Sequence, residues 1–250
     1  YSTTRGFFIQ CPFLWVQFSM CDIYFKFFCK TTCQVVEKSV YYYLRGDVMG
    51  RPNYLNEIKR IITNAETGTV FVAVDFVNIT DKKTVSMGLT RLEADGLIRR
   101  VLRGVYDKPE YNDFLGEYVA PSPNKVANAL ARNFGWTIVP CGDTALNLLG
   151  LSTQVPAEWV YVSDGTYKKY TYDNTTIEFK RTTNKEVSKL SYKTALTVQA
   201  LKALGKEKID DIVINRLTKL LTADEKKTML EEAKAATSWI YEYIKLICRS

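Results

Sequence analysis

The spacing of apolar residues changes from helical to extended between residues 82 and 106. In the first half, apolar side chains recur every three or four residues, at Val85, Leu89 and Leu92. After a stop at Asp95-Gly96, a short extended run leads into a tight turn at Gly104. A helix followed at once by a short hairpin is the plan of a winged helix-turn-helix, which we expect over residues 49–118.

The side of this predicted helix that faces away from the apolar stripe is polar and basic. Thr80 or Asp81 can cap the helix, because a short side-chain oxygen accepts hydrogen bonds from unpaired backbone amides. From Asp81 to Lys108 the chain holds seven Lys or Arg and four Asp or Glu, a net charge of +3. We therefore expect DNA contacts from a helix in the groove and from an arginine-rich wing on the phosphates. The residues expected at DNA are Lys82, Lys83, Ser86, Thr90, Arg91, Arg99, Arg100 and Arg103. A solvated helix and an exposed hairpin of an unrelated domain would give the same pattern.

The remaining pattern predicts an α+β fold. Its N-terminal winged helix-turn-helix is followed, over residues 119–250, by a mixed α/β domain with a helical C-terminal part. Residues 107–120 are expected only to connect the two. Within the first part we expect a helix over 55–62, a strand over 69–72 and a short helix over 74–79 whose Phe76, Val77 and Ile79 meet the apolar stripe. The second part is predicted to contain helices over 122–134, 143–149, 192–204, 209–221 and 222–247, a strand over 136–139, another over 159–162 and a hairpin over 169–181.

Residues 1–48 do not match the rest of the sequence. The run from Phe7 to Phe28 is rich in aromatic residues but is interrupted by polar ones, and no signal-peptide cleavage site follows it. Three explanations stay open: a fragment or translated sequence upstream of the true start, a membrane anchor, or a segment that binds a partner. A membrane partner is not our expectation for the chain as a whole.

Composition narrows the chemistry that the chain can perform. The formal net charge is +7, which favours anionic partners such as nucleic acid. Histidine is absent, which excludes Ser-His-Asp and Cys-His nucleophiles and every zinc site that needs histidine. The spacing of Cys29 and Cys33 lacks a second pair to complete a metal site. We expect no metal and no small-molecule cofactor, and the cysteine pattern fits a reducing cytoplasm.

An enzyme acting on nucleic acid is a further hypothesis. Its candidate groups would be Asp143, Asp164, Glu178 and Lys180. No two of these carboxylates stand at a spacing that requires a metal pair, so we do not expect an enzyme.

Several blocks resemble one known family. They are residues 103–109, the helix 126–132, the run Leu149-Gly150-Leu151-Ser152-Thr153-Gln154-Val155-Pro156, the pair Asp164-Gly165 and residues 177–181. Together they resemble the AbiEi-like antitoxins of type IV toxin–antitoxin systems, from about Asn53 to Cys248.

The resemblance implies a bacterial protein of two domains that serves in abortive infection. Its winged helix would bind double-stranded operator DNA and act as a transcriptional repressor of its own operon. Its second domain would counter a nucleotidyltransferase-like toxin. The residues expected at a partner protein are Ser152, Thr153, Gln154, Lys180 and Arg181. The alternative is a protein-interaction module whose winged helix no longer binds DNA.

Overall fold

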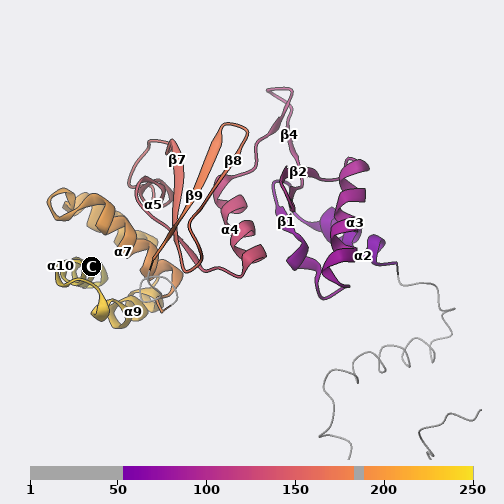
Figure 1. Ribbon diagram of the computed structural model, residues 1–250. Coiled ribbons are helices and arrows are strands. Elements are labelled where there is room, and N and C mark those ends of the chain that lie inside the picture. Colours follow the sequence, from indigo (N-terminus) through magenta and orange to yellow (C-terminus); the bar gives the residue numbers. More distant parts are fainter. Residues whose placement is uncertain (1–52, 183–188, 250) are drawn as a thin grey trace, which may run out of the picture. The chain divides into compact units, whose positions relative to one another are not determined.

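The first sheet among the described residues is small and antiparallel, and it shares a hydrophobic core with the helices α2 (Tyr54–Asn64) and α3 (Lys82–Ala94). The computed structural model describes residues 53–182 and 189–249 (Figure 1); the expectations for residues 1–48 lie outside these. The elements come in the order α2 (Tyr54–Asn64), β1 (Val70–Val72), the short 3-10 helix η1 (Ala73–Phe76), α3 (Lys82–Ala94), β2 (Arg99–Leu102) and β3 (Val105–Asp107). The strands lie in the order β1-β3-β2, all antiparallel.

Helix α3 begins and ends where its sequence predicts. The Asp81 carboxylate accepts a hydrogen bond from the Thr84 amide at 3.0 Å, which caps the first turn. Gly96 follows the helix with a φ of 73°, a backbone conformation that glycine adopts without steric cost. The apolar stripe is fully buried, against Ile58 of α2 and Phe76 of η1 among others. One expectation was wrong, because Val77 is 49% exposed instead of meeting the stripe.

The segment expected to be a connection contains an element of its own. Strands β4 (Glu110–Asn112) and β5 (Glu117–Val119) pair antiparallel in a separate two-stranded sheet. Residues 107–120 are therefore more than a linker. The strands are only three residues long, and so they lack the longer alternation by which a strand is predicted from sequence.

A four-stranded sheet, which we call the second sheet, follows this hairpin in the chain. Its strands are β6 (Ile138–Pro140), β7 (Glu158–Ser163), β8 (Lys168–Tyr172) and β9 (Thr175–Arg181), in the order β6-β7-β9-β8. The β7–β9 pair is parallel and the other pairs are antiparallel. Helix α5 (Asp143–Leu148) lies between β6 and β7 in sequence, and its N-cap residue is Gly142.

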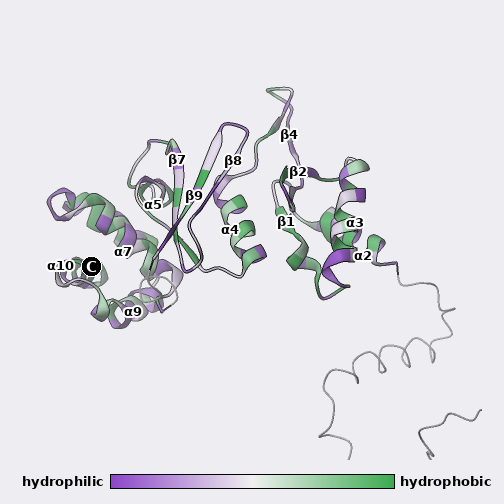
Figure 2. Ribbon diagram, viewed as in Figure 1, coloured by the Kyte–Doolittle hydropathy of each residue, from purple (hydrophilic) through white to green (hydrophobic). Residues whose placement is uncertain are grey.

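Helix α4 (Pro123–Phe134) connects this second sheet to the first. Its buried residues share one core with Val70 and Val105 of the first sheet and with Tyr161 and Phe179 of the second. Hydrophobic residues (green) mark β1 and much of α4 in Figure 2.

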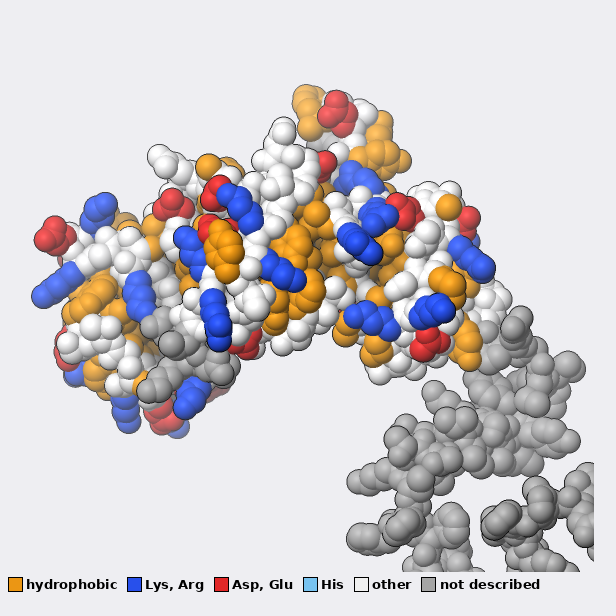
Figure 3. Space-filling view, viewed as in Figure 1, with side chains coloured by type: hydrophobic (Ala, Val, Ile, Leu, Met, Phe, Trp, Pro, Cys, Tyr) orange, Lys and Arg blue, Asp and Glu red, His pale blue; other side chains and the backbone are white. Residues whose placement is uncertain are grey.

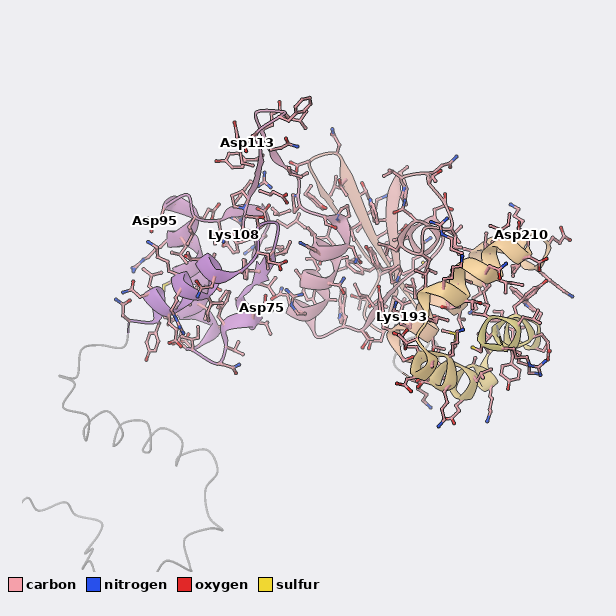
Figure 4. All side chains as sticks on the ribbon, turned by 180° about the vertical axis from the view of Figure 1, so that it is seen from behind. Asp75, Asp95, Lys108, Asp113, Lys193 and Asp210 are labelled. Carbon is pink, nitrogen blue, oxygen red and sulfur yellow. The ribbon has the colours of Figure 1, made fainter. Side chains whose placement is uncertain are left out.

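An ion pair reinforces the contact of α4 with the first sheet. The Arg132 guanidinium of α4 donates from Nε to Asp75 Oδ1 at 2.8 Å and from Nη2 to Asp75 Oδ2 at 3.1 Å. It also donates to the Val70 carbonyl at 3.1 Å. Asp75, which is labelled in Figure 4, accepts in addition from the Val72 amide, so it joins η1 to α4.

The C-terminal part is helical, as expected. Helix α7 (Tyr192–Leu204) is buried on nearly all sides in a core that it shares with α5 and the last helices. The helices that follow α7 are η2 (Lys206–Lys208), α8 (Asp211–Leu220), α9 (Ala223–Glu232), η3 (Ala233–Ala235) and α10 (Ser238–Arg249). Thr222 and Glu225 form a capping box at the start of α9, where a helix was expected to begin. The stretch expected as one helix over 222–247 is thus divided, with extended backbone at Ala236.

No helix among residues 53–182 and 189–249 combines the length and the apolar character needed to span a membrane.

Candidate nucleic-acid interface

The exposed side of α3 is made of polar and basic side chains. All five helix residues expected at DNA are exposed, namely Lys82, Lys83, Ser86, Thr90 and Arg91. Met87, also on this side, is 51% exposed. The opposite side packs on α2, where Gly88 is buried and a Cβ built on it would make an ordinary van der Waals contact with the Ile58 side chain at 3.5 Å.

The two hydroxyl groups on this surface are oriented by the helix itself. Ser86 Oγ donates to the Lys82 carbonyl at 2.9 Å, and Thr90 Oγ1 donates to the Ser86 carbonyl at 3.0 Å. Each hydroxyl therefore presents its oxygen lone pairs outward. In this arrangement Ser86 and Thr90 can accept hydrogen bonds, and the base-edge groups that donate in the major groove are the amino groups of cytosine and adenine.

The charge on α3 has one sign over most of its length. No Asp or Glu occurs between Lys82 and Leu92. The acid that precedes the helix, Asp81, is engaged by Thr84, whose side chain and backbone amide both donate to it and lower its pKa. Its carboxylate therefore serves as the helix cap. A surface of this kind attracts a polyanion.

The β2–β3 hairpin offers two free arginines rather than three. Arg100 and Arg103 are exposed. Arg99 instead donates from Nε to Asp107 Oδ1 at 3.1 Å and from Nη2 to Asp107 Oδ2 at 2.5 Å. A further bond runs from Arg99 Nη2 to the Val119 carbonyl of β5 at 2.9 Å. The bond with Asp107 raises the pKa of Arg99, and together with the bond to the Val119 carbonyl it holds the guanidinium in one position.

The pairing of Asp107 with Arg99 was not predicted from the sequence. The side chain of Asp107 is 1% exposed, and it forms an ion pair with Arg99. A bulge decides which arginine it meets, because the register shifts between Arg100 and Leu102 and places Arg99 opposite Asp107. Without this shift, a two-residue turn after Leu102 would have placed Arg100 there. The acid itself was visible in the sequence, but the register was not.

Basic side chains also occur on the neighbouring helix. Lys59 and Arg60 of α2 are exposed, and sequence reasoning did not single them out. Figure 3 shows Lys and Arg side chains (blue) gathered over the region of α2, α3 and β2. The basic surface is therefore broader than α3 and the β2–β3 hairpin alone.

The residues expected at a partner protein fall into two separate groups. Thr153 and Gln154 are exposed in the loop before β7, where Asn147 Nδ2 donates to the Gln154 carbonyl at 2.9 Å and the Gln154 amide donates to Ser152 Oγ at 3.2 Å. Lys180 and Arg181 are exposed at the opposite end of the sheet, because β9 runs parallel to β7 and pairs them with Val162 and Ser163. Four residues of strand separate the two ends, roughly 13 Å. The five residues therefore form two groups, one at each end of β7.

The candidate groups for an enzyme are also dispersed or engaged. Asp164 Oδ1 accepts from the Thr137 amide at 2.9 Å, and Lys180 Nζ lies 3.8 Å from Glu178 Oε2. Among residues 53–182 and 189–249, no group of three or more metal-binding side chains is placed to hold an ion. Burial raises the pKa of the thiols of Cys141 and Cys248, which is the reverse of the activation that a nucleophilic cysteine needs.

Comparison with known proteins gives one family. Residues 57–229 match the model of DUF6088, which is described as a family of unknown function. The chain belongs to the DUF6088 family. No curated protein matches it. The part shared with DUF6088 takes in α3, the β2–β3 hairpin, the β4–β5 hairpin and the second sheet, and it stops at Met229 within α9.

Proposed function

We propose that this DUF6088 protein is a transcriptional repressor that binds double-stranded DNA through a winged helix-turn-helix formed by α2 to β3. The proposal is supported by the order helix, strand, helix, hairpin in that part of the chain. In such domains the second main helix enters the major groove and the hairpin lies on the flanking backbone. Here these roles belong to α3 and to the β2–β3 hairpin.

The observation that carries the proposal is the exposed side of α3 together with the free wing arginines. Lys83, Ser86 and Thr90 would reach base edges. Their exposed positions on one side of a capped helix suit this role. Four further cations would neutralise phosphates: Lys82, Arg91, Arg100 and Arg103. Arg99 has no part in this interface, because Asp107 and Val119 hold its guanidinium.

The second half of the proposal is an antitoxin function in the bacterial cytoplasm, against a nucleotidyltransferase-like toxin. It is supported by the resemblance to AbiEi-like antitoxins and by the exposure of Thr153 and Gln154 in the resembling block Leu149 to Pro156. Part of that block has a folding role. Gly150 has a φ of 64°, and a Cβ on it would lie 2.7 Å from Arg216 Nη2. The exposed loop that follows Gly150 is therefore the part of the block that is free to bind.

Salt dependence of DNA binding tests the repressor function. The probe is duplex DNA from immediately upstream of the protein's own reading frame, with a random-sequence duplex for comparison. If the four cations assigned to phosphates, Lys82, Arg91, Arg100 and Arg103, each neutralise one phosphate, log affinity should fall with log salt at a slope of about −3 to −4 between about 50 and 200 mM. Replacing both Arg100 and Arg103 by alanine should flatten that slope by about 2.

A matched control removes the same charge elsewhere. Lys206 and Lys208 are exposed on η2, and replacing both by alanine should leave the slope of the wild type almost unchanged. If the wing variant keeps the full slope, or if the control flattens it equally, the wing is not at the DNA. If no duplex is bound at all while the product of the adjacent reading frame is, the interaction-module hypothesis replaces the repressor.

Base contacts need a separate readout. Replacing Thr90 by alanine should reduce the preference for the upstream duplex over the random one, with the salt slope unchanged, because a hydroxyl contact to a base carries no charge. The antitoxin function is tested by co-expression with the adjacent reading frame: replacing both Thr153 and Gln154 by alanine should weaken rescue of growth while leaving DNA binding intact.

A further inference from the structure

The short β4–β5 hairpin leaves four large apolar side chains more than half exposed. Phe114 is 95% exposed, Leu115 65%, Tyr118 61% and Tyr111 52%. Single exposed apolar residues are common on proteins, but a continuous group of them marks an interaction surface. Figure 3 shows hydrophobic side chains (orange) at the tip of this hairpin, where Asp113 is labelled in Figure 4. We name Tyr111, Phe114, Leu115 and Tyr118 the hairpin patch.

The hairpin patch is held in a defined conformation. Asn112 Oδ1 accepts hydrogen bonds from the amides of Phe114 at 3.0 Å and Leu115 at 3.2 Å, which fixes the turn. The rings of Tyr111 and Tyr118 meet edge to face, with centroids 5.1 Å apart. At the base of the hairpin, the β5 carbonyl at position 119 accepts from Arg99. A surface ordered in this way loses little conformational entropy when it binds.

Of the three acids of the hairpin, Glu110 and Glu117 lie on its other side, whereas Asp113 is exposed in the turn next to Phe114. Tyr111 is opposite Tyr118, whereas Glu110 and Glu117 occupy alternate positions and therefore point to the opposite face. Glu110 faces Gly68 and Lys125 across a small pocket. The tyrosine side of the hairpin thus carries no charge from either strand, and two such sides can meet without bringing these carboxylates together.

We propose that the occupant of the hairpin patch is the same patch on a second copy of this chain. An aromatic side chain presents about 150–250 Å², so the exposures of the three rings and Leu115 correspond to roughly 400–500 Å² per copy. Two copies would bury roughly 800–1,000 Å² in total, the low end for a specific interface. The expected assembly is a weak twofold dimer in which each patch meets itself. Its formation does not depend on DNA binding.

Sedimentation velocity of the full chain without DNA, across a concentration series, tests the proposal. The wild type should pass from monomer to dimer as concentration rises. Replacing Phe114 by glutamate should weaken the dimer at least tenfold, because a central aromatic contributes most at an interface and a buried charge opposes it. Ile212 of α8 is 74% exposed and lies outside the patch, so Ile212→Glu is the control and should dimerise like the wild type.

Cross-linking locates the contact. Replacing Phe114 by benzoylphenylalanine and irradiating should join two copies, with the attachment at residues 110–119 of the second copy. A chain that stays monomeric at every concentration, a dimer that Phe114→Glu leaves intact, or attachment outside 110–119 would each overturn the proposal. None of these outcomes bears on DNA binding by α3, which is measured separately.

Discussion

Two neighbouring arginines of β2 should behave in opposite ways when each is replaced by alanine. Arg100→Ala should flatten the salt slope of DNA binding by about 1 and change the stability by less than about 0.5 kcal/mol. Arg99→Ala should leave the slope nearly unchanged and lower the stability. The residue type, the strand and the charge removed are the same, so the contrast depends only on what each side chain contacts.

The size of the Arg99 effect follows from the burial of its partner. The side chain of Asp107 is 1% exposed and that of Arg99 is 36% exposed. Removing one member of a fully buried ion pair costs about 3–5 kcal/mol, because the other charge is left without a partner. Since water reaches the exposed part of Arg99, we expect about 2–3 kcal/mol, to which the lost bond to the Val119 carbonyl contributes.

The assay is urea unfolding followed by circular dichroism, with the salt titration performed under conditions in which each variant is folded. A second variant isolates the buried charge. Adding Asp107→Asn to Arg99→Ala should recover part of the lost stability, because a neutral amide is less costly to bury than an unpaired carboxylate. Equal stability of Arg99→Ala and Arg100→Ala, or equal flattening of the slope by both, would refute the assignment of Arg99 to the fold.

Three further predictions concern folding. Gly165→Ala should cost about 1–3 kcal/mol in urea unfolding, because the added Cβ would lie 2.3 Å from the Trp136 ring. Gly104→Ala should cost about 1–2 kcal/mol by the same assay, because the turn holds a φ of 79°, whereas its Cβ would meet nothing within 4 Å. Burial raises the pKa of Glu232, but hydrogen bonds from Thr194 and Ser191 outweigh it and leave the pKa below the ordinary value of a glutamate, 4.5. The stabilisation by Glu232 is thus present above that value and lost as pH falls through the lower folded pKa. Glu232→Gln should therefore show a shallower loss of stability in acid, and an acid limb as steep as in the wild type would contradict this.

Features that depend on neighbouring residues along the chain could be predicted from the sequence. The apolar stripe and its cap gave the bounds of α3, and the capping box at Thr222 gave the start of α9. The polar side of α3 was predicted for the same reason, since burial of one side of a helix leaves the other in solvent. The glycine turn at Gly104 is equally local.

Features that depend on pairing between separate elements needed the tertiary structure. A one-residue bulge places Arg99 opposite Asp107 and leaves Arg100 exposed. No spacing of residues within β2 or β3 specifies this bulge. The parallel register of β7 and β9 placed Lys180 near the end of β7 that lies opposite to the loop at Gln154. The spacing of apolar residues within one helix or strand predicts which of its sides is buried, and this needs no knowledge of the other elements. Which charged groups meet is decided by how elements align, and this alignment separates Arg99, which is paired with Asp107, from Arg100, which stays exposed.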